Sequence, residues 1–448
     1  MWRRRKHRRL LHLTIEKLIY GGDGLARLPA DENGRGKAVF VPFVLPSEEI
    51  EALITEQRPG FARARAESVL QPSAQRIVPQ CPHFSQCGGC HYQHTSYENQ
   101  LAIKTGILLE TLRRTAHLEV PGEVSIHPSP PWAYRNRSRF QIRVGAEFAA
   151  GYYRAASHEV LSVRECPISS LLVNRCLAAL WQTGTAQQGA DDVLEIELFA
   201  NAADTQVLAE FICREGANTR DMLGRWAADL QAAVPEIVGF GASIPLRTGQ
   251  VSGERRWPIA GSQHLIYEAK RAKYRVSAGA FFQTNRHMLD QLTDVVCAGE
   301  VAENVLDLYS GVGLFSTVLA RDARHIVSVE SSQPAADDLA YNLPPGGKAV
   351  CGTAEKYLAA DKPKGGFRRG QLDLVIVDPP RAGLGERIAA QVAALAARRL
   401  TYVSCDPATL ARDLVPVIAA GYRVEKVHLI DMFPQTYHLE TVVKLARG

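Results

Sequence analysis

The chain has 448 residues, which is too long for one ordinary domain, so two to four domains are expected. With 46% hydrophobic and 22% charged residues and a net charge of +5, its composition is that of a globular protein of only mildly basic character. No apolar run approaches the roughly 18 residues that a membrane-spanning helix needs, so no membrane partner is expected.

Six of the first nine residues are Lys or Arg, and neither an apolar stretch nor a small-residue cleavage site follows them. We therefore expect a cytoplasmic protein. Residues 1–11 are predicted to form a basic arm. Such an arm is either a solvated tail or a segment that binds the phosphates of a nucleic acid, and the composition supports both equally.

Residues 12–70 have the pattern of about five short strands separated by Gly- and Pro-containing turns. This pattern predicts a small all-β barrel of the OB type, which is a common platform for single-stranded nucleic acid. A β domain with a purely structural role is the alternative.

Three of the nine cysteines are closely spaced, in the pattern C-x5-C-x2-C formed by Cys81, Cys87 and Cys90. An odd number of cysteines in a large chain argues against a secreted disulfide framework and favours a metal site. Three thiolates need a fourth ligand, and Cys166, which Pro167 follows, is the candidate. The spacing alone supports an iron–sulfur cluster and zinc equally.

Residues 71–270 are predicted to form a second, substrate-side domain of mixed α/β structure that includes the thiol cluster. Residues 97–117 have helical spacing, and the segment from Trp132 to Arg143 alternates basic and aromatic residues along an expected strand. That strand either contacts nucleic-acid phosphates or presents a solvated face.

From residue 271 to 448, strands alternate with helices, which predicts a doubly wound α/β sheet. The first strand leads into Asp307-x3-Gly311-x-Gly313, and the second ends at Glu330. The glycines let the backbone approach a ligand closely, and the acid can accept hydrogen bonds from ribose hydroxyls. Because the third glycine of the dinucleotide fingerprint is missing, the motif favours S-adenosylmethionine over NAD.

A later strand ends at Cys405, just before Pro407 opens a helix. Open α/β sheets bind ligands at this edge, and a helix N-terminus favours a thiolate. Taken alone, a Cys after a strand is more often a small buried hydrophobe. The preceding strand ends in Asp378-Pro-Pro-Arg381, and the arginine argues against enzymes that methylate amino groups, which place an aromatic residue there.

In their order along the chain these motifs resemble those of the iron–sulfur-containing RNA uracil-5 methyltransferases, in the branch that acts on 23S ribosomal RNA. The resemblance covers nearly the whole chain and implies an N-terminal TRAM domain and a C-terminal Rossmann-like methyltransferase domain. It is carried by the C-x5-C-x2-C cluster, Phe282-Gln283, Asp307-Leu-Tyr-Ser-Gly311-Val-Gly313, Asp378-Pro-Pro-Arg381, Ser404-Cys405-Asp-Pro407-Ala-Thr and Phe433-Pro434-Gln-Thr-x-His438-x-Glu440.

The resemblance also implies roles for individual residues. Cys405 would add to C6 of a uracil, and Glu440 would remove the C5 proton. The S-adenosylmethionine contacts would come from Gln283, Tyr309, Glu330 and Asp378. A 4Fe–4S cluster would be bound by Cys81, Cys87, Cys90 and Cys166.

The implied substrate is a uridine of 23S ribosomal RNA, which must be extruded into the site, with the barrel, taken as basic, gripping the RNA. Asp378 would also hydrogen-bond the N3–H edge of the uracil. A monomer is expected, and no protein partner is indicated.

Other functions fit parts of the sequence. They are the same chemistry on a tRNA uridine, a non-catalytic RNA-binding or ribosome assembly factor, and methylation at another atom. The presence of both Cys405 and Glu440 argues against a pure binding factor. Radical S-adenosylmethionine chemistry is disfavoured, because the thiols of such enzymes follow C-x3-C-x2-C, whereas those of this chain follow C-x5-C-x2-C. One departure from the family pattern is Asp406, where Asn is common, and it places an extra charge beside the thiol.

Overall fold

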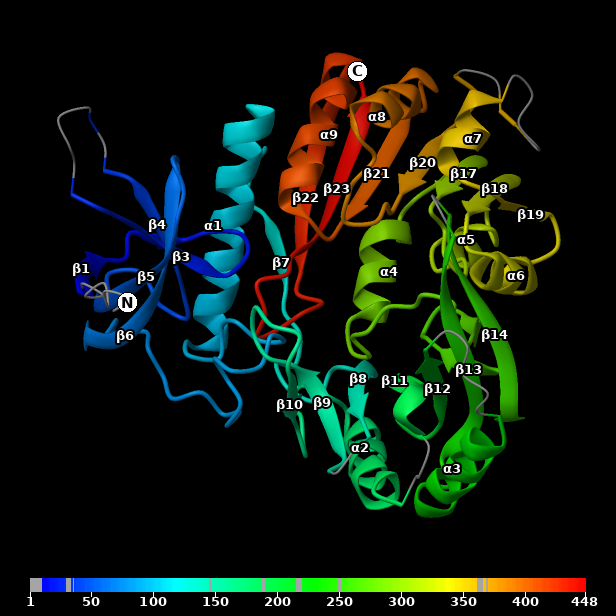
Figure 1. Ribbon diagram of the computed structural model, residues 1–448. Coiled ribbons are helices and arrows are strands. Elements are labelled where there is room, and N and C mark those ends of the chain that lie inside the picture. The colour runs from blue at the N-terminus through cyan, green and yellow to red at the C-terminus, as the bar shows by residue number, and fades with distance from the viewer. Residues whose placement is uncertain are drawn as a thin grey trace. The chain divides into compact units, whose positions relative to one another are not determined.

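A computed structural model describes residues 10–29, 34, 36–144, 147–186, 190–214, 220–248, 251–360, 366–367 and 370–448. All but the last two residues of the predicted basic arm lie outside these ranges. The chain divides into two compact units (Figure 1). The first unit runs to residue 110 and also takes in residues 433–438, while the second comprises residues 111–432 and 439–448. In the described chain no helix has both the length and the hydropathy to cross a membrane.

The first unit contains a six-stranded sheet in the order β1-β5-β6-β4-β3-β2. All neighbouring strands are antiparallel except β4 and β6. Alternate side chains of each strand point inward, so that Leu13, Val39, Val41 and Ile50 are fully buried in one core. The strands are β1 (Leu10–Thr14), β2 (Lys17–Leu18), β3 (Asp23–Arg27), β4 (Ala38–Pro42), β5 (Glu49–Gln57) and β6 (Phe61–Gln71).

The description of this β domain as basic is wrong. Between residues 12 and 70 there are seven Lys and Arg residues and nine Asp and Glu residues. The arginines on the outer face of β6 are also paired, Arg63 with Asp23 at 3.0 Å and Arg65 with Glu67 at 2.7 Å. Any contact of this domain with RNA must therefore use more than excess positive charge.

The first part of the second unit is a seven-stranded sheet in the order β10-β9-β8-β11-β12-β13-β14, with two helices beside it. The sequence pattern also predicts strands at 138–144, 193–200 and 206–212, and these are present as β8, β11 and β12. The sheet is built from β8 (Arg137–Arg143), β9 (Ala149–Tyr153), β10 (Val160–Ser162), β11 (Val193–Ala200), β12 (Val207–Cys213), β13 (Ile237–Thr248) and β14 (Val251–Gly261), and the helices are α2 (Leu171–Gly184) and α3 (Arg220–Ala233).

The C-terminal part of the second unit is an eight-stranded sheet in the order β19-β18-β17-β20-β21-β23-β22-β7. The first five strands are parallel, and β23 runs antiparallel to both of its neighbours. The predicted doubly wound sheet is therefore present. Its strands are β17 (Asn304–Leu308), β18 (His325–Glu330), β19 (Gly347–Cys351), β20 (Leu374–Val377), β21 (Arg399–Ser404), β22 (Tyr422–Ile430), β23 (Glu440–Arg447) and β7 (Ser125–His127).

Helices connect the parallel strands, as this topology requires (Figure 1). They are α5 (Ser316–Leu319), α6 (Gln333–Asn342), α7 (Ala354–Ala359), α8 (Glu386–Ala394) and α9 (Pro407–Ala419), while α4 (Leu289–Cys297) precedes β17. A hairpin of β15 (His264–Glu268) and β16 (Lys273–Ser277) precedes them, and α1 (Tyr97–Ala116) precedes β7. The four residues of β20 are all fully buried, as expected for a central parallel strand.

Candidate active site

The strand order creates a switch point between β17 and β20. The chain adds β18 and β19 on one side of β17, and then returns to add β20 and β21 on the other side. Leu308 and Val377, the last residues of β17 and β20, are paired neighbours. Tyr309 and Asp378, which follow them, therefore leave the sheet at the same edge. A crevice at such a switch point is the usual ligand site of open α/β sheets.

The glycine-rich turn after β17 is tied to the end of β18. The Gly311 N–H donates to Glu330 Oε2 at 2.9 Å, and the Ser332 N–H donates to Glu330 Oε1 at 2.6 Å. A Cβ at Gly311 would meet nothing within 4 Å, so the backbone there faces open space. Gly313, at φ +92°, has no such room, because a Cβ would lie 2.8 Å from Leu339. The turn is therefore fixed and can admit a ligand beside Gly311.

The carboxyl groups of Asp307, Glu330 and Asp378 give this edge of the sheet a negative potential. Burial raises the pKa of Asp307 to about 7. Burial also raises the pKa of Asp378, and the charges of Asp307 and Glu330 raise it further. Asp307 Oδ1 and Ser310 Oγ are buried and have no hydrogen-bond partner in the described part of the chain. Such an edge favours a polar, cationic ligand and disfavours a pyrophosphate.

The register of β21 and β23 places Cys405 beside Glu440. Ser404 pairs with Thr441 in this antiparallel ladder. Cys405 directly follows Ser404 and Glu440 directly precedes Thr441, so both residues lie at the same end of this ladder, where the charge of Glu440 acts on the Cys405 thiol. A thiol and a carboxyl that are 35 positions apart in the sequence thus share one site.

The residues around Cys405 do not stabilise its thiolate, contrary to the expectation from the helix N-terminus. Burial raises the pKa of the Cys405 thiol to about 12, and the charges of Glu440, Asp378 and Asp406 contribute. Asp406 is the N-cap of α9, and its Oδ1 accepts hydrogen bonds from the Ala408 and Thr409 amides at 2.9 Å each. Two N–H groups at the helix start are therefore already bonded to a carboxylate.

Glu440 is almost completely buried, with 3% of its surface exposed. Burial raises its pKa well above the usual range, and the charge of Asp378 adds to this effect. The Arg381 guanidinium acts in the opposite direction and lowers the pKa values of both Glu440 and Cys405. In the sequence, Arg381 served only to exclude enzymes that methylate amino groups. Its place directly after Asp378-Pro-Pro is the signal that could have added it to the site.

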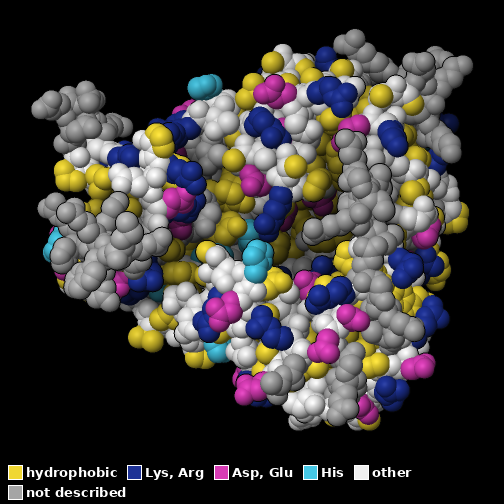
Figure 2. All heavy atoms as spheres, in the orientation of Figure 1, with side chains coloured by type: hydrophobic (Ala, Val, Ile, Leu, Met, Phe, Trp, Pro, Cys, Tyr) yellow, Lys and Arg dark blue, Asp and Glu magenta, His cyan; other side chains and the backbone are white. Residues whose placement is uncertain are grey.

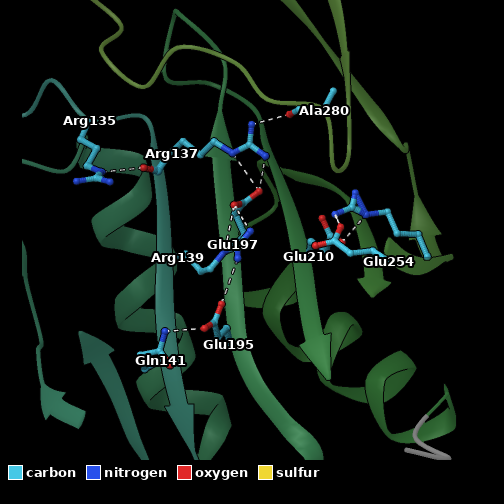
Figure 3. A network of polar contacts seen from close by, with 10 residues as sticks. Arg135, Arg137, Arg139, Gln141, Glu195, Glu197, Glu210, Glu254 and Ala280 are labelled. Atoms are coloured by element: carbon cyan, nitrogen blue, oxygen red, sulfur yellow. Dashed lines mark hydrogen bonds and ion pairs between the residues drawn. The ribbon is translucent and has the colours of Figure 1, made fainter. Parts of the chain in front are cut away.

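Gln283 lies in a segment between β16 and α4 that is anchored at several points. The Ser277 N–H and hydroxyl donate to the two carboxylate oxygens of Asp338, at 2.6 and 2.8 Å. The Arg137 guanidinium donates to the Ala280 carbonyl at 2.7 Å (Figure 3). Only 8% of the surface of Gln283 is exposed. The sequence pattern also predicts a helix that opens within residues 277–285 and runs to about residue 298, but the structure has no helix there before α4 begins at Leu289.

The basic strand β8 is paired with glutamates rather than left free. Figure 3 shows Arg137 and Arg139 turned toward Glu197 of the neighbouring strand β11. The Arg137–Glu197 and Arg139–Glu197 distances are 2.5 and 3.1 Å. On the visible face of the second unit, Lys and Arg side chains are scattered among Asp and Glu (Figure 2). The phosphate-contact interpretation of this strand is weakened accordingly, because its charges are already compensated.

Tyr309, the first residue after β17, has an unusual backbone conformation with φ 61°. Its hydroxyl lies 3.4 Å from Glu355 Oε1, in α7. Burial raises the pKa of this hydroxyl, so it stays protonated. Glu355 was not identified from the sequence, because only the fold brings the start of α7 to the carboxyl end of β17.

The predicted metal ligands are distributed between the two units. Cys81, Cys87 and Cys90 are half-buried in the first unit, and Cys166 is half-buried in the second. The Gly89 N–H donates to Cys87 Sγ at 3.4 Å. Within the described ranges, no group of three or more His, Cys, Asp or Glu side chains is arranged to hold a metal ion.

Two family models match the chain. The model described as tRNA (Uracil-5-)-methyltransferase matches residues 96–448, and the TRAM domain model matches residues 4–66. The second match confirms the predicted N-terminal TRAM domain.

Similar proteins and structures agree with these matches. A protein of Aquifex aeolicus described as an RNA methyltransferase is 32% identical over 443 residues, covering 97% of this chain and 98% of its own. A relative from Listeria innocua with the same description is 30% identical and covers 98% of both chains. The crystal structure of Pyrococcus abyssi tRNA (uracil-54, C5)-methyltransferase in complex with S-adenosyl-L-homocysteine has the same fold, with a TM-score of 0.69, 23% identity and coverage of 97% of this chain and all of its own.

Proposed function

Because the chain belongs to the tRNA (uracil-5-)-methyltransferase family of RNA-methylating enzymes, we propose that it methylates C5 of a uridine in 23S ribosomal RNA with S-adenosylmethionine as the methyl donor. The observation that carries this proposal is the pairing of β21 with β23, because Cys405 and Glu440 both adjoin the Ser404–Thr441 pair that ends it. A nucleophile and a base beside an acidic crevice are what C5 methylation of a uracil needs.

The crevice at the switch point suits this methyl donor. Glu330 can accept from ribose hydroxyls, the open side of Gly311 leaves room for the nucleoside, and the unpartnered Asp307 Oδ1 and Ser310 Oγ offer polar contacts. Gln283 and Tyr309 would complete the contacts, with Asp378 at the reacting end. When bound, S-adenosylmethionine supplies an electrophilic methyl group on a positively charged sulfur, and that charge matches the negative potential of Asp307, Glu330 and Asp378.

Cys405 acts first in the proposed reaction. The sulfur of its thiolate forms a bond to C6 of the uracil, and the electrons of the C5–C6 double bond make C5 an enolate-like nucleophile. C5 would then take the methyl group, and the bond between that methyl group and the donor sulfur would break, so that S-adenosylhomocysteine leaves. The thiol must first lose its proton, and solvent water accepts it. Because carboxylates raise the thiol pKa, we expect Cys405 to be activated only when the substrate and the cationic donor occupy the site.

Glu440 completes the reaction. Its carboxylate takes the C5 proton, the electron pair re-forms the C5–C6 double bond, and the bond between C6 and the Cys405 sulfur breaks. A carboxylate whose burial raises its pKa is a stronger base than an exposed one, which suits this role. Asp378 would hold the N3–H edge of the uracil, and the positive charge of Arg381 would favour the ionised forms of Cys405 and Glu440.

A 4Fe–4S cluster on Cys81, Cys87, Cys90 and Cys166 is part of the proposal. The donor set is right for such a cluster, and the Gly89 N–H bond to Cys87 Sγ is of the kind that stabilises a thiolate ligand. No step of the methylation passes through it. Iron and sulfide analysis of anaerobically purified protein tests this part, and zinc in place of iron would contradict it.

The choice of RNA rests on the sequence resemblance to the 23S branch. A tRNA uridine is the second candidate, because the matching family model is described by its tRNA substrates. The protein is proposed to act in the cytoplasm as a monomer.

Trapping with 5-fluorouridine tests the function. Fluorine at C5 cannot leave as a proton, so the covalent adduct should persist after methyl transfer and shift the RNA band in denaturing electrophoresis. We expect an adduct with 23S ribosomal RNA fragments that is absent in Cys405→Ala. An adduct with tRNA alone would transfer the function to the second candidate, and no adduct with any RNA would contradict the covalent mechanism.

A further inference from the structure

The loop that connects β22 to β23 is held by residues far away in the sequence. Ile430 and Glu440 are paired at its two ends. Its middle, Phe433–His438, belongs to the first compact unit, although both strands belong to the second. Gln435 at its centre is buried and has a left-handed backbone, with φ 68°. A non-glycine residue in this conformation needs external support.

Gln100 of α1 provides much of that support. Its side-chain carbonyl accepts from the Gln435 N–H at 2.9 Å, and its side-chain amide lies 3.0 Å from Gln435 Oε1. The same amide donates to the carbonyls of Tyr92 and Thr95 at 3.1 and 3.2 Å. Gln100 is itself buried. One side chain therefore bonds both the backbone and the side chain of Gln435.

Lys104, one turn further along α1, holds the start of the loop. It has no exposed surface, and its ammonium donates to the Phe433 carbonyl at 2.9 Å. Residues four apart lie on the same face of a helix, so Gln100 and Lys104 act side by side. An ammonium is costly to bury, and a lysine buried only to fill space would be replaced by an apolar side chain without loss.

A third contact comes from the segment that follows the closely spaced cysteines. The His91 and Tyr92 amides both donate to the Gln435 carbonyl, at 2.8 and 3.0 Å. The N–H, the C=O and the side chain of Gln435 are thus all bonded to residues between 91 and 100.

We propose that Gln100 and Lys104 are positioning residues for the base: by fixing Phe433–His438 they set the approach of the chain to Glu440, two residues beyond His438. This inference rests on the proposed function of Glu440. Its consequence is specific to one step. Addition of Cys405 and methyl transfer do not use Glu440. Loss of the contacts that Gln100 and Lys104 make with Phe433–His438 should therefore slow proton removal and leave the earlier steps nearly unchanged.

The test separates the two steps in a single turnover. RNA that carries tritium at C5 of its uridines is mixed with the enzyme and with S-adenosylmethionine labelled with carbon-14 in its methyl group. Carbon-14 in the RNA reports methyl transfer, tritium in water reports proton removal, and a denaturing gel shows the covalent adduct between them. The variants are Lys104→Met and the isosteric Gln100→Glu, with Glu440→Gln as the reference for a missing base and Arg113→Met, at an exposed position of α1, as the matched control.

We expect Gln100→Glu and Lys104→Met to release tritium about 100-fold more slowly than the wild type, which is the loss expected when a base is misplaced by about 1 Å. Methyl transfer should fall less than about threefold, and the methylated adduct should accumulate as it does in Glu440→Gln. Equal losses in both steps, or no loss, in variants with an unchanged melting temperature would overturn the inference. If Glu440→Gln itself accumulates no adduct, the proposed role of Glu440 fails first, which distinguishes the two failures.

Discussion

The thiol of Cys405 should be unreactive until the site is filled. Burial and the neighbouring carboxylates raise its pKa from the ordinary value of 9.0 to about 12. At pH 8 the thiolate fraction of an ordinary thiol is about one tenth, whereas that of Cys405 is about one ten-thousandth. Alkylation by iodoacetamide, which consumes the thiolate, should therefore be roughly 1000-fold slower at Cys405 than at an unperturbed thiol.

Two variants should raise this reactivity by removing negative charge. Asp406→Asn keeps an oxygen for the helix cap but removes a partly exposed charge, worth about 1 kcal/mol or a fivefold faster alkylation. Glu440→Gln removes the larger contribution, so its effect should exceed that of Asp406→Asn. The gain in alkylation rate caused by Glu440→Gln should also grow with pH, because the raised pKa of Glu440 keeps part of this residue neutral near pH 7.

The assay follows alkylation of the Cys405 peptide by mass spectrometry from pH 7 to 10.5. The exposed Cys351 is the internal control in the same sample. Restricted access would slow alkylation of Cys405 by the same factor at every pH, whereas a raised pKa makes the rate climb about tenfold per pH unit up to pH 10.5. A plateau near pH 9, or equal rates for Cys405 and Cys351 at pH 8, would refute the reasoning.

Three further predictions concern the crevice and the base. Asp307→Asn should make the protein without bound donor more stable at pH 8 by about 2 kcal/mol. The pKa of Asp307, raised from 3.8 to about 7, sets an upper limit of about 4 kcal/mol, and we expect half of it. The same variant should bind S-adenosylmethionine more weakly in calorimetry. Because this folded pKa is raised, the stability of the wild type should decline as pH rises from about 4 to 7, and urea titrations of the variant should lack that decline. Gly313→Ala should cost about 1–3 kcal/mol, because φ +92° and the contact with Leu339 both oppose a side chain, whereas an unchanged urea midpoint would contradict the geometry of the turn. Tritium release should slow as pH falls through the raised pKa of Glu440, and in a pre-formed methylated adduct Glu440→Gln should remove this dependence.

Local sequence signals were sufficient for the edge of the parallel sheet. Pro407 directly after Cys405-Asp marks the start of α9, and the run Leu374–Val377 can only be a buried strand. The strands β13 and β14 gave no such signal. Val251–Gly261 is rich in charged residues, Gly and Pro, and it becomes a strand because Ile237–Thr248 supplies a partner for a long hairpin.

Electrostatic properties were the least accessible from sequence. The helix start beside Cys405 indicated a favoured thiolate, but the opposite result follows from Asp406 as the cap and from Glu440 across the ladder. Likewise, the arginines of β8 look like a phosphate-binding strand until β11 places Glu197 between Arg137 and Arg139. The charge of Asp406 is visible beside Cys405 in the sequence, but the contributions of Glu440 and Glu197 depend on pairings between distant segments, which a single sequence does not reveal.

The bonds between Gln100 and Gln435 also have a consequence for biosynthesis. The two residues are 335 positions apart, so the first unit lacks one of its packing partners until nearly the whole chain has left the ribosome. Contacts of such long range form late and slowly, because a large loop must close before they contribute. A nascent or truncated chain that ends before residue 433 should therefore expose Gln100 and Lys104 of α1, which are buried in the complete protein. Its N-terminal unit should be sensitive to proteases and dependent on chaperones until the last hairpin arrives.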